Sequence, residues 1–511
     1  MTNSLLQSLE QQFGFHAFRE GQEEIIQSVI QGTDVIAILP TGRGKTLCYH
    51  LPAKLLDGLT IVVSPLVSLM EDQVTQMRAS GDKRVAHLSS LINDTEKKKV
   101  LANLHSYHLI FLSPEMLSLP FIQRTLSKVK VDLFVVDEAH CISQWGHEFR
   151  TDYLRLKGVR KQLGNPPCLA LTATATKEVE KDICVHLGLK KEVVVRFPVN
   201  RENIFMAVES MESIREKEEY FINKIHSVQW PAIVYTGTRQ RAMNYAALLS
   251  RSGIEKVAFY HGGMTKEDRI LVQQQFIRDE IDIICCTNAF GMGINKSNIR
   301  SVIHLHLPST IEQYVQEIGR AGRDGKQSLA LLIYCDEDLF LPLSFIETEF
   351  PDDDFLKQLM TDESIDGKKV ADLKQHFPLN ETQWRMVTFY LEKENVVQNG
   401  EFQFGTRRKE VLNEMISNFD QRRKEKIYQL DCLKRFVQTD TCYRKNVTVY
   451  FNDAMAERPE WCCSSCQSTG QYITWAEKNI DSIHRSLKNK EEKYDWKDTL
   501  KKILISKNGD V

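Results

Sequence analysis

Residues 38–46, ILPTGRGKT, combine glycines with a lysine and a threonine at the spacing of a phosphate-binding loop. The segment joins a predicted strand to a predicted helix, so backbone N–H groups at the helix start can bind phosphate oxygens. Lys45 would meet the β and γ phosphates of a nucleotide, and Thr46 would ligate Mg²⁺. Position 39 departs from the strict pattern, because it is leucine rather than glycine. The predicted nucleotide contacts of this loop are Thr41, Gly42, Arg43, Gly44, Lys45 and Thr46.

A pair of adjacent carboxylates follows another apolar stretch. Residues 133–136 predict a buried strand, and Asp137 and Glu138 come directly after it. Asp137 would ligate Mg²⁺, and Glu138 would polarise the water that attacks the γ phosphate. Such a pair at a strand end is usually only a solvated turn, but the phosphate loop ahead of it favours the catalytic interpretation.

Two arginines in the second half of the chain could complete this site. Hydrolysis needs positive charge near the γ phosphate, and an arginine from another domain can supply it. Arg320 and Arg323 lie three apart in residues 316–325, QEIGRAGRDG, which would place them on one helical face. The alternative, an ordinary exposed basic helix, fits poorly with the glycines of the segment. We therefore predict that these arginines reach the site when two halves of the chain close.

The apolar stretches that would position these residues recur in two series, with a seam near residues 200–207. Helix-length amphipathic segments separate them, which is typical of parallel sheets covered by helices on both faces. The sequence therefore predicts an α/β protein with two tandem parallel-sheet domains. The predicted strands are residues 35–39, 61–63, 109–112, 133–136 and 169–172, then 232–235, 257–260, 281–285, 301–305 and 329–334.

The pattern changes after residue 342. Helical spacing and a strand-turn-strand around Asn399 and Gly400 indicate a winged-helix-like fold or, about as well, packed helices with an edge hairpin. A long basic helix, roughly 407–437, follows. The predicted domains are 1–205, 206–342, 343–406 (winged-helix-like), 407–470 (helical and zinc-binding) and 471–511 (a charged tail).

Four cysteines crowd together after the long helix. Four thiolates can form a closed structural zinc site, and buried free cysteines are the alternative. The predicted ligands are Cys442, Cys462, Cys463 and Cys466.

Composition bounds the class of protein. The chain has 511 residues, with 42% hydrophobic and 26% charged residues, so we expect several globular domains rather than disorder. The formal charge of −2 means that nucleic-acid binding would need local basic surfaces. We find neither a signal-like N-terminus nor an apolar stretch long enough for a membrane, so we expect a cytoplasmic protein, nucleoid-associated if bacterial.

The order of the motifs resembles the RecQ family of DNA helicases, in superfamily two, in a short bacterial-type form. FGFHAFREGQ, SPLVSLMEDQV, DEAHCISQWGHEFR, LTATAT and AFGMGINK join the segments above in family order over roughly residues 5–340. DEAHCISQWGHEFR is highly specific, because DEAH-type RNA helicases share only its first four letters. The resemblance implies RecA-like domains, ATP, Mg²⁺ and Zn²⁺, and 3′-to-5′ DNA unwinding in recombination, repair or replication-fork maintenance.

The resemblance also assigns residues by position. Arg19 and Gln22 match the adenine-recognising motif, and Gly291 and Gly293 match a motif that touches nucleotide and strand. Residues 143–150 match an aromatic-rich loop that links DNA contact to hydrolysis, and aromatic faces can stack on unpaired bases. An aromatic plug that packs one loop is the alternative. The implied DNA-binding and coupling residues are Trp145, His147, Phe149, Arg150, Ser64, Ser113, Thr236, Arg239 and Asn295.

The chain departs from the family pattern at three places. Arg43 stands where most relatives have glycine, His50 stands where glutamine is usual, and Cys462 and Cys463 are adjacent where the family spaces its cysteines C-x2-C-x2-C. The expected partners are single-stranded and forked duplex DNA and a single-strand-binding protein, with a monomeric chain. An RNA helicase, a translocase that does not unwind, and a binding scaffold with an inactive ATPase are the alternatives.

Overall fold

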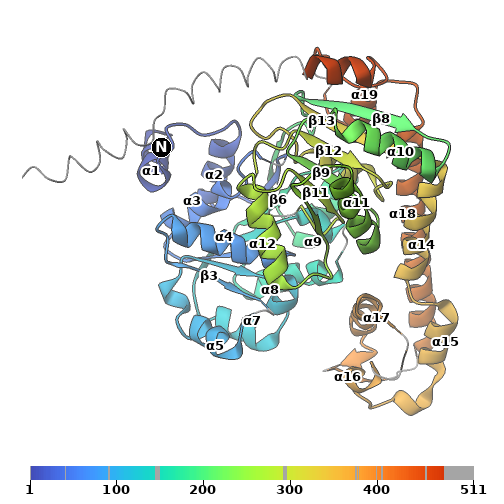
Figure 1. Ribbon diagram of the computed structural model, residues 1–511. Coiled ribbons are helices and arrows are strands. Elements are labelled where there is room, and N and C mark those ends of the chain that lie inside the picture. Colours follow the sequence, from blue (N-terminus) through green and yellow to red (C-terminus); the bar gives the residue numbers. More distant parts are fainter. Residues whose placement is uncertain are drawn as a thin grey trace, which may run out of the picture.

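The computed structural model describes residues 2–476, except residues 41, 90–91, 144–149, 292–295, 375–376, 378, 399, 404–406 and 455–456. Two separate parallel sheets dominate the molecule, and a group of helices extends from the second sheet (Figure 1). We call residues 2–196, from α1 (Thr2–Phe13) to β7 (Val193–Arg196), lobe 1. Lobe 2 is residues 204–334, from β8 (Ile204–Ser210) to β13 (Ser328–Tyr334), and the C-terminal helical segment is residues 353–402, from α15 (Asp353–Thr361) to β15 (Glu401–Phe402).

Lobe 1 is built on a seven-stranded sheet in the order β3-β4-β2-β5-β6-β1-β7. Alternate residues of β1 belong to different hydrophobic clusters: Ile36 and Ile38 pack into one, and Val35 and Ala37 into the other. Both faces of the sheet are therefore covered, which explains the continuous apolar strands. The strands are β1 (Val35–Ile38), β2 (Leu59–Val63), β3 (Val85–Leu88), β4 (Leu109–Leu112), β5 (Val131–Val136), β6 (Cys168–Thr172) and β7 (Val193–Arg196). The helices are α1 (Thr2–Phe13), α2 (Gln22–Ile30), α3 (Leu47–Leu55), α4 (Val67–Ala79), α5 (Asp94–Ala102), α6 (Pro114–Leu117), α7 (Pro120–Leu126), α8 (Leu156–Gln162) and α9 (Lys177–Leu187).

Lobe 2 repeats this architecture with a six-stranded sheet in the order β10-β11-β9-β12-β13-β8. All neighbouring strands run parallel. The strands are β8 (Ile204–Ser210), β9 (Ala232–Tyr235), β10 (Val257–Tyr260), β11 (Ile283–Cys286), β12 (Ser301–His304) and β13 (Ser328–Tyr334). The helices are α10 (Ile214–Ile225), α11 (Arg239–Arg251), α12 (Lys266–Ile277) and α13 (Ile311–Ile318).

The predicted α/β fold with two tandem parallel sheets is confirmed, and all ten predicted strands are present to within two or three residues at each end. The sequence prediction missed β3, β7 and β8. Strand β8 begins at Ile204 and pairs with β13 of lobe 2, so it crosses the boundary predicted at 205/206.

The C-terminal helical segment has a hydrophobic core of its own, in which Trp384, Val387 and Phe402 are buried. Helices precede a short antiparallel hairpin there, which both the winged-helix-like prediction and its alternative of packed helices with an edge hairpin expected. Helix α18 runs from this segment back to lobe 2, beside α14 (Figure 1). The elements are α14 (Phe340–Glu349), α15 (Asp353–Thr361), α16 (Val370–Leu373), α17 (Glu381–Lys393), β14 (Val397–Gln398), β15 (Glu401–Phe402), α18 (Arg408–Val437) and α19 (Tyr443–Tyr450).

The cysteine-rich region does not form a separate core. Leu433 of α18, Val447 of α19 and Cys463 pack in the same hydrophobic cluster as Ile204 of lobe 2. The backbone N–H of Ser464 donates to the carbonyl of Met206 in β8 at 2.8 Å. The region is therefore an extension of lobe 2.

The first residues of the predicted charged tail also pack against lobe 2. Tyr472 stacks on Phe205 with ring centroids 4.4 Å apart, and Ile473 is buried beside them. Residues 477–511 of that tail lie outside the described residues. Within the described part of the chain, no helix has the length and apolar character needed to cross a membrane.

The C-terminal helical segment contacts lobe 1. Arg155 lies 2.5 Å from Glu392 of α17, and Arg385 of the same helix lies 3.4 Å from Glu115. The segment is therefore joined by the chain to lobe 2 while its helix α17 rests on lobe 1.

Candidate active site

The phosphate-binding loop connects β1 to α3, as predicted, and α3 begins at Leu47 directly after Thr46. Gly42 and Gly44 have φ values of 88° and 78°, a left-handed conformation that favours glycine. The charge of Lys45 acts on the carboxyl of Asp137 to lower its pKa, against the larger effect of burial. Thr41 lies outside the described residues.

Gln22 and Arg19, the predicted adenine contacts, bind the backbone of this loop. The side-chain amide of Gln22 donates to the carbonyls of Arg43 and Gly44 at 3.0 and 3.1 Å. Its oxygen accepts from the backbone N–H of Arg19 at 2.9 Å, and the Arg19 guanidinium donates to the carbonyl of Gly42. The adenine-recognising motif and the phosphate loop are therefore one hydrogen-bonded unit.

The carboxylate pair lies at the end of β5. Burial and the neighbouring Glu138 raise the pKa of Asp137 to about 7, although Lys45 acts to lower it. Oε2 of Glu138 is buried, makes no hydrogen bond with the described residues, and lies 3.4 Å from Nδ1 of His140. Two adjacent, largely buried carboxylates, one with an oxygen that no described residue hydrogen-bonds, fit a divalent cation as a further partner.

His140, whose Nδ1 lies 3.4 Å from Glu138, connects this pair to the LTATAT segment through two hydrogen bonds. Nδ1 of His140 lies 3.0 Å from the Thr172 hydroxyl, which donates to the carbonyl of Thr174 at 2.9 Å. Thr172 ends β6, next to β5 and β1 in the sheet. Changes at Glu138 can therefore reach Thr174 through two side chains.

Arg320 and Arg323 do not lie on a helix, and that part of the prediction is wrong. Helix α13 ends at Ile318, and the glycines after it turn the chain. Arg320 is buried and donates to the carbonyl of Gly291, a predicted nucleotide contact. Arg323 lies against the phosphate loop, since a Cβ built at Gly42 would be 3.4 Å from its Cγ. The structure thus brings Arg323 of lobe 2 to the phosphate loop of lobe 1, and it holds Arg320 against Gly291 within lobe 2.

The arginine turn is shaped by Arg201, which the sequence prediction missed. Its guanidinium donates to the carbonyls of Gly322 at 2.6 Å and Gly319 at 3.3 Å. Burial, together with Arg320 and Arg201, lowers the pKa of Arg323 to about 10, so the group still carries its charge at neutral pH. Only the position of Arg201 at the seam between the two sheets could have indicated this role.

Arg43, the departure in the phosphate loop, lies at the edge of this cleft. Its guanidinium is 3.2 Å from Glu20 and 4.3 Å from the centre of the Phe197 ring. These contacts hold the Arg43 side chain beside the phosphate-binding loop.

The predicted DNA contacts are described only in part. Trp145, His147 and Phe149, with Gly293 and Asn295, lie outside the described residues. Arg150 donates to the carbonyl of Pro65 at 3.0 Å and lies 3.9 Å from Glu115, which also contacts α17.

Three predicted hydroxyl contacts are buried. The Thr236 hydroxyl donates to the carbonyl of Cys286 at 3.2 Å, and the Ser113 hydroxyl accepts from the backbone N–H of Met116 at 3.3 Å. Ser64 is 2% exposed. The hydroxyls of Thr236 and Ser113 therefore stabilise their own loops, and the Ser64 hydroxyl is buried without a hydrogen-bond partner among the described residues.

Arg239 lines an open groove of about 690 Å³ at the carboxyl ends of the strands of lobe 2. Phe345 of α14 lines the same groove and is 52% exposed. The groove therefore offers a guanidinium and an exposed aromatic ring.

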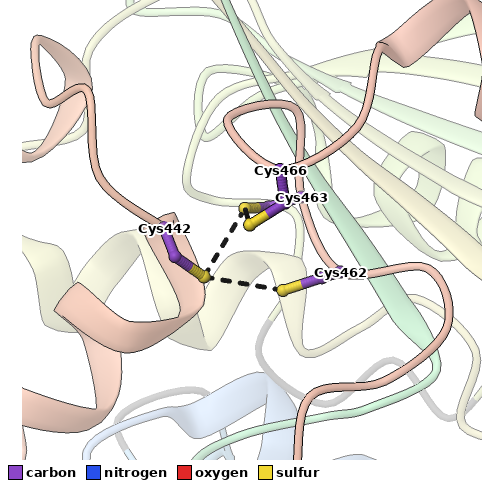
Figure 2. A group of neighbouring side chains, drawn as sticks. All are labelled: Cys442, Cys462, Cys463 and Cys466. Atoms are coloured by element: carbon purple, nitrogen blue, oxygen red, sulfur yellow. Dashed lines mark hydrogen bonds between the residues drawn. The ribbon is translucent and has the colours of Figure 1, made fainter.

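The four cysteines meet at one point, as Figure 2 shows. The sulfur of Cys442 lies 3.5 Å from that of Cys462 and 3.7 Å from that of Cys463, and Cys463 and Cys466 are 3.5 Å apart. Thiolates on a common Zn²⁺ lie about 3.8 Å apart, because each Zn–S bond is about 2.3 Å. The adjacent pair Cys462 and Cys463 thus both reach the cluster.

Comparison with known proteins identifies the class of the two lobes. The DEAD/DEAH box helicase model matches residues 19–182, and the helicase conserved C-terminal domain model matches residues 216–325. The fold is similar to that of the DEAD-box helicase Mss116 bound to ssRNA, with a TM-score of 0.56, 19% identity, and 81% of this chain and 88% of that chain covered. It is also similar to Mycobacterium smegmatis Lhr bound to ssDNA and AMP-PNP, with a TM-score of 0.53, 22% identity, and 66% and 49% covered. The tandem lobes are therefore those of a superfamily-two helicase.

Proteins with similar sequences identify the family within superfamily two. The chain is 43% identical over 470 residues to the "Probable ATP-dependent DNA helicase RecS" of Bacillus subtilis, covering 90% of this chain and 92% of that protein. It is 42% identical over 341 residues to the "ATP-dependent DNA helicase RecQ" of the same organism, covering 66% of this chain and 57% of that protein. The chain therefore belongs to the RecQ-like family of ATP-dependent DNA helicases, as its motifs indicated, and ATP with a divalent metal is its cofactor pair.

Proposed function

We propose that this chain hydrolyses ATP to move 3′ to 5′ along single-stranded DNA and to unwind the duplex ahead of it. The observation that carries the proposal is the contact of Arg323 from lobe 2 with Gly42 in the phosphate loop of lobe 1. A nucleotide at that loop would touch both lobes, so its hydrolysis would change their contact. Repeated opening and closing would shift the grip of the lobes on the strand.

The residues of the cleft divide the chemistry among them. Lys45 binds the β and γ phosphates, and Thr46 and Asp137 hold the divalent ion, Mg²⁺, which neutralises phosphate charge. Glu138 orients the attacking water, and its open Oε2 is suited to accept a proton. Arg320 and Arg323 stabilise the charge that develops on the γ phosphate.

Contact with DNA is proposed for residues outside the cleft. Arg239 pairs with phosphates in the groove of lobe 2, and Arg150 does so beside the aromatic-rich loop. Trp145, His147 and Phe149 stack on bases. Backbone N–H groups of the loops that follow Ser64, Ser113 and Thr236 contact phosphates, whereas the hydroxyls of these three residues are buried.

The four cysteines hold one structural Zn²⁺ in this proposal. The support is the mutual spacing of their sulfur atoms. The ion would join α19 to the chain after it and so stabilise the extension of lobe 2.

Two assays test the motor. ATP hydrolysis is compared with single-stranded DNA and with RNA, and strand displacement is compared on duplexes with a 3′ or a 5′ tail. We expect DNA to stimulate hydrolysis more strongly than RNA, displacement from the 3′ tail, and loss of both activities in Lys45→Ala. Displacement only from 5′ tails, stimulation only by RNA, or hydrolysis without displacement would each contradict the proposal. The monomeric state, nucleoid association and a single-strand-binding protein partner stay predictions from the sequence.

A further inference from the structure

A second group of metal-binding side chains lies in lobe 1, outside the machinery described above. His50 belongs to α3, Asp82 follows α4, and His108 precedes β4. They are 5%, 7% and 6% exposed, and their ligand atoms all lie within 4.8 Å of one another. Three segments far apart in the sequence thus converge on one buried point.

The two histidines approach the same carboxylate oxygen. Nε2 of His50 lies 2.8 Å, and Nε2 of His108 3.0 Å, from Oδ2 of Asp82. The other oxygen, Oδ1, accepts from the backbone N–H of Arg84 at 3.3 Å, so the carboxylate is held in place. Ligand atoms that share a zinc ion lie about 3.3 Å apart, because each bond is about 2.0–2.1 Å.

His108 gives the second observation. Although its Nε2 is close to Asp82, the pair is not aligned as a hydrogen bond, and neither ring nitrogen of His108 has a hydrogen-bond partner among the described residues. A buried imidazole without partners is costly. Two atoms that bind the same metal ion lie close together but point at the ion and not at each other. Nε2 of His108 and Oδ2 of Asp82 have this arrangement.

We propose that His50, Asp82 and His108 bind a transition-metal ion through the two Nε2 atoms and Oδ2, with Zn²⁺ as the favoured ion. Two imidazoles and one carboxylate suit Zn²⁺ and neighbouring divalent metals, and water can complete the coordination. The ion would tie α3, which begins at the phosphate loop, to the chain before β3 and β4. This inference does not depend on the proposed DNA unwinding.

The ammonium group of Lys54 would compete with a metal ion for the carboxylate of Asp82. Its ammonium lies 3.4 Å from Oδ2 of Asp82, 3.4 Å from Oε1 of Gln12 and 5.3 Å from the centre of the Phe13 ring. The alternative structure is a carboxylate shared by two imidazoles and this ammonium. Binding of the ion would shift Lys54 toward Gln12 and Phe13, which it already contacts.

The test uses the full chain, freed of metal with a chelator and titrated with Co²⁺ and then Zn²⁺. Thiolate-bound Co²⁺ shows charge-transfer absorption, whereas Co²⁺ on imidazole and carboxylate shows only ligand-field bands, so the two sites report separately. We expect one equivalent without charge transfer. His50→Gln and His108→Gln should each lose it and keep any thiolate signal, and His105→Gln, an exposed histidine of the same lobe, should change nothing.

Two further readouts sharpen the test. Lys54→Met removes the competing charge and should bind the ion about tenfold more tightly, a change of about 1.4 kcal/mol. Zn²⁺ should raise the thermal midpoint of the wild type more than that of folded His50→Gln. If the wild type binds no ion beyond the thiolate site, or if both histidine variants bind as many equivalents as the wild type, the cluster is a hydrogen-bonded triad only and the proposal is wrong.

Discussion

Arg323 of lobe 2 lies against Gly42 of lobe 1, with 3.4 Å between the Arg323 Cγ and a Cβ built at the glycine. If this guanidinium acts on the γ phosphate, Arg323→Ala should slow ATP hydrolysis by about 10³-fold or more and leave nucleotide binding nearly unchanged. Single-turnover hydrolysis and nucleotide titration measure the two effects. Arg251→Ala, at the exposed end of α11, is the control. Hydrolysis by Arg323→Ala within a few-fold of the wild type would remove this arginine from the mechanism.

Gly322 fixes the turn between the two arginines. It has a φ of 55°, and a Cβ there would meet Asn203 and lie 2.6 Å from the Ser328 hydroxyl. Gly322→Ala should therefore lower the free energy of unfolding by about 1–3 kcal/mol, measured in urea. Gly325→Ala is a matched control, because its φ is 81° but a Cβ there would meet nothing within 4 Å. Equal losses in both variants would show that the packing around Gly322 contributes nothing.

The cysteine cluster shares its core with lobe 2, so metal loss should be felt there. Cys466→Ser should remove about one equivalent of zinc, that of the thiolate site, and lower the thermal midpoint of lobe 2. Metal analysis and calorimetry measure both. Cys432→Ser, a cysteine of α18 outside the cluster, should keep its zinc. Less than half an equivalent in the wild type would end the zinc proposal.

Glu317 and His304 form a buried pair 2.7 Å apart in lobe 2. Burial acts to raise the pKa of Glu317, but the hydrogen bond and charge of His304 outweigh it and hold the pKa below 4.5. The pair therefore stabilises the protein fully above the ordinary carboxyl pKa and loses this contribution as the pH falls through the lower, folded value. Glu317→Gln should cost about 1–3 kcal/mol at neutral pH. Unfolding measured from neutral to acidic pH should show this difference shrinking, unlike exposed Glu255→Gln; a constant difference would contradict the assignment.

The contact between Arg155 and Glu392 can be tested by exchanging the charges. Both side chains are more than a third exposed, at 36% and 37%, so we expect a coupling energy of only about 0.5–1 kcal/mol. Arg155→Glu and Glu392→Arg should each loosen the C-terminal helical segment, and the double variant should restore it. Urea unfolding and limited proteolysis of the four proteins measure the coupling. Additive effects in the double variant would mean that the pair does not hold the segment.

The sequence predicted the two sheets well because their strands are continuous apolar runs between turns. It missed β3, where His87 interrupts the apolar pattern, and β8, which begins inside the predicted seam. It also missed β7, which has only three apolar residues before Arg196. It placed Arg320 and Arg323 on a helix because spacing alone does not show where glycines end one.

The sequence predicted which residues form the candidate site, but it did not predict how they are arranged in space. Motif spacing indicated Lys45, Asp137 and the arginines, whereas Arg201 carries no such signal. Contacts between distant segments, such as Arg155 with Glu392 or His50 with His108, depend on tertiary packing and leave no local pattern.

The two halves of helix α18 pack in two different hydrophobic cores. Phe419 packs in the C-terminal helical segment, and Phe436 packs in the core of lobe 2. The helix has 30 residues and is therefore about 45 Å long. The end of α18 that lies away from lobe 2 packs in the C-terminal helical segment, whose helix α17 contacts lobe 1. A small rotation of one lobe against the other would move the distant end of α18 by a larger distance. When ATP hydrolysis rotates the lobes, either α18 must bend or the contact between α17 and lobe 1 must break.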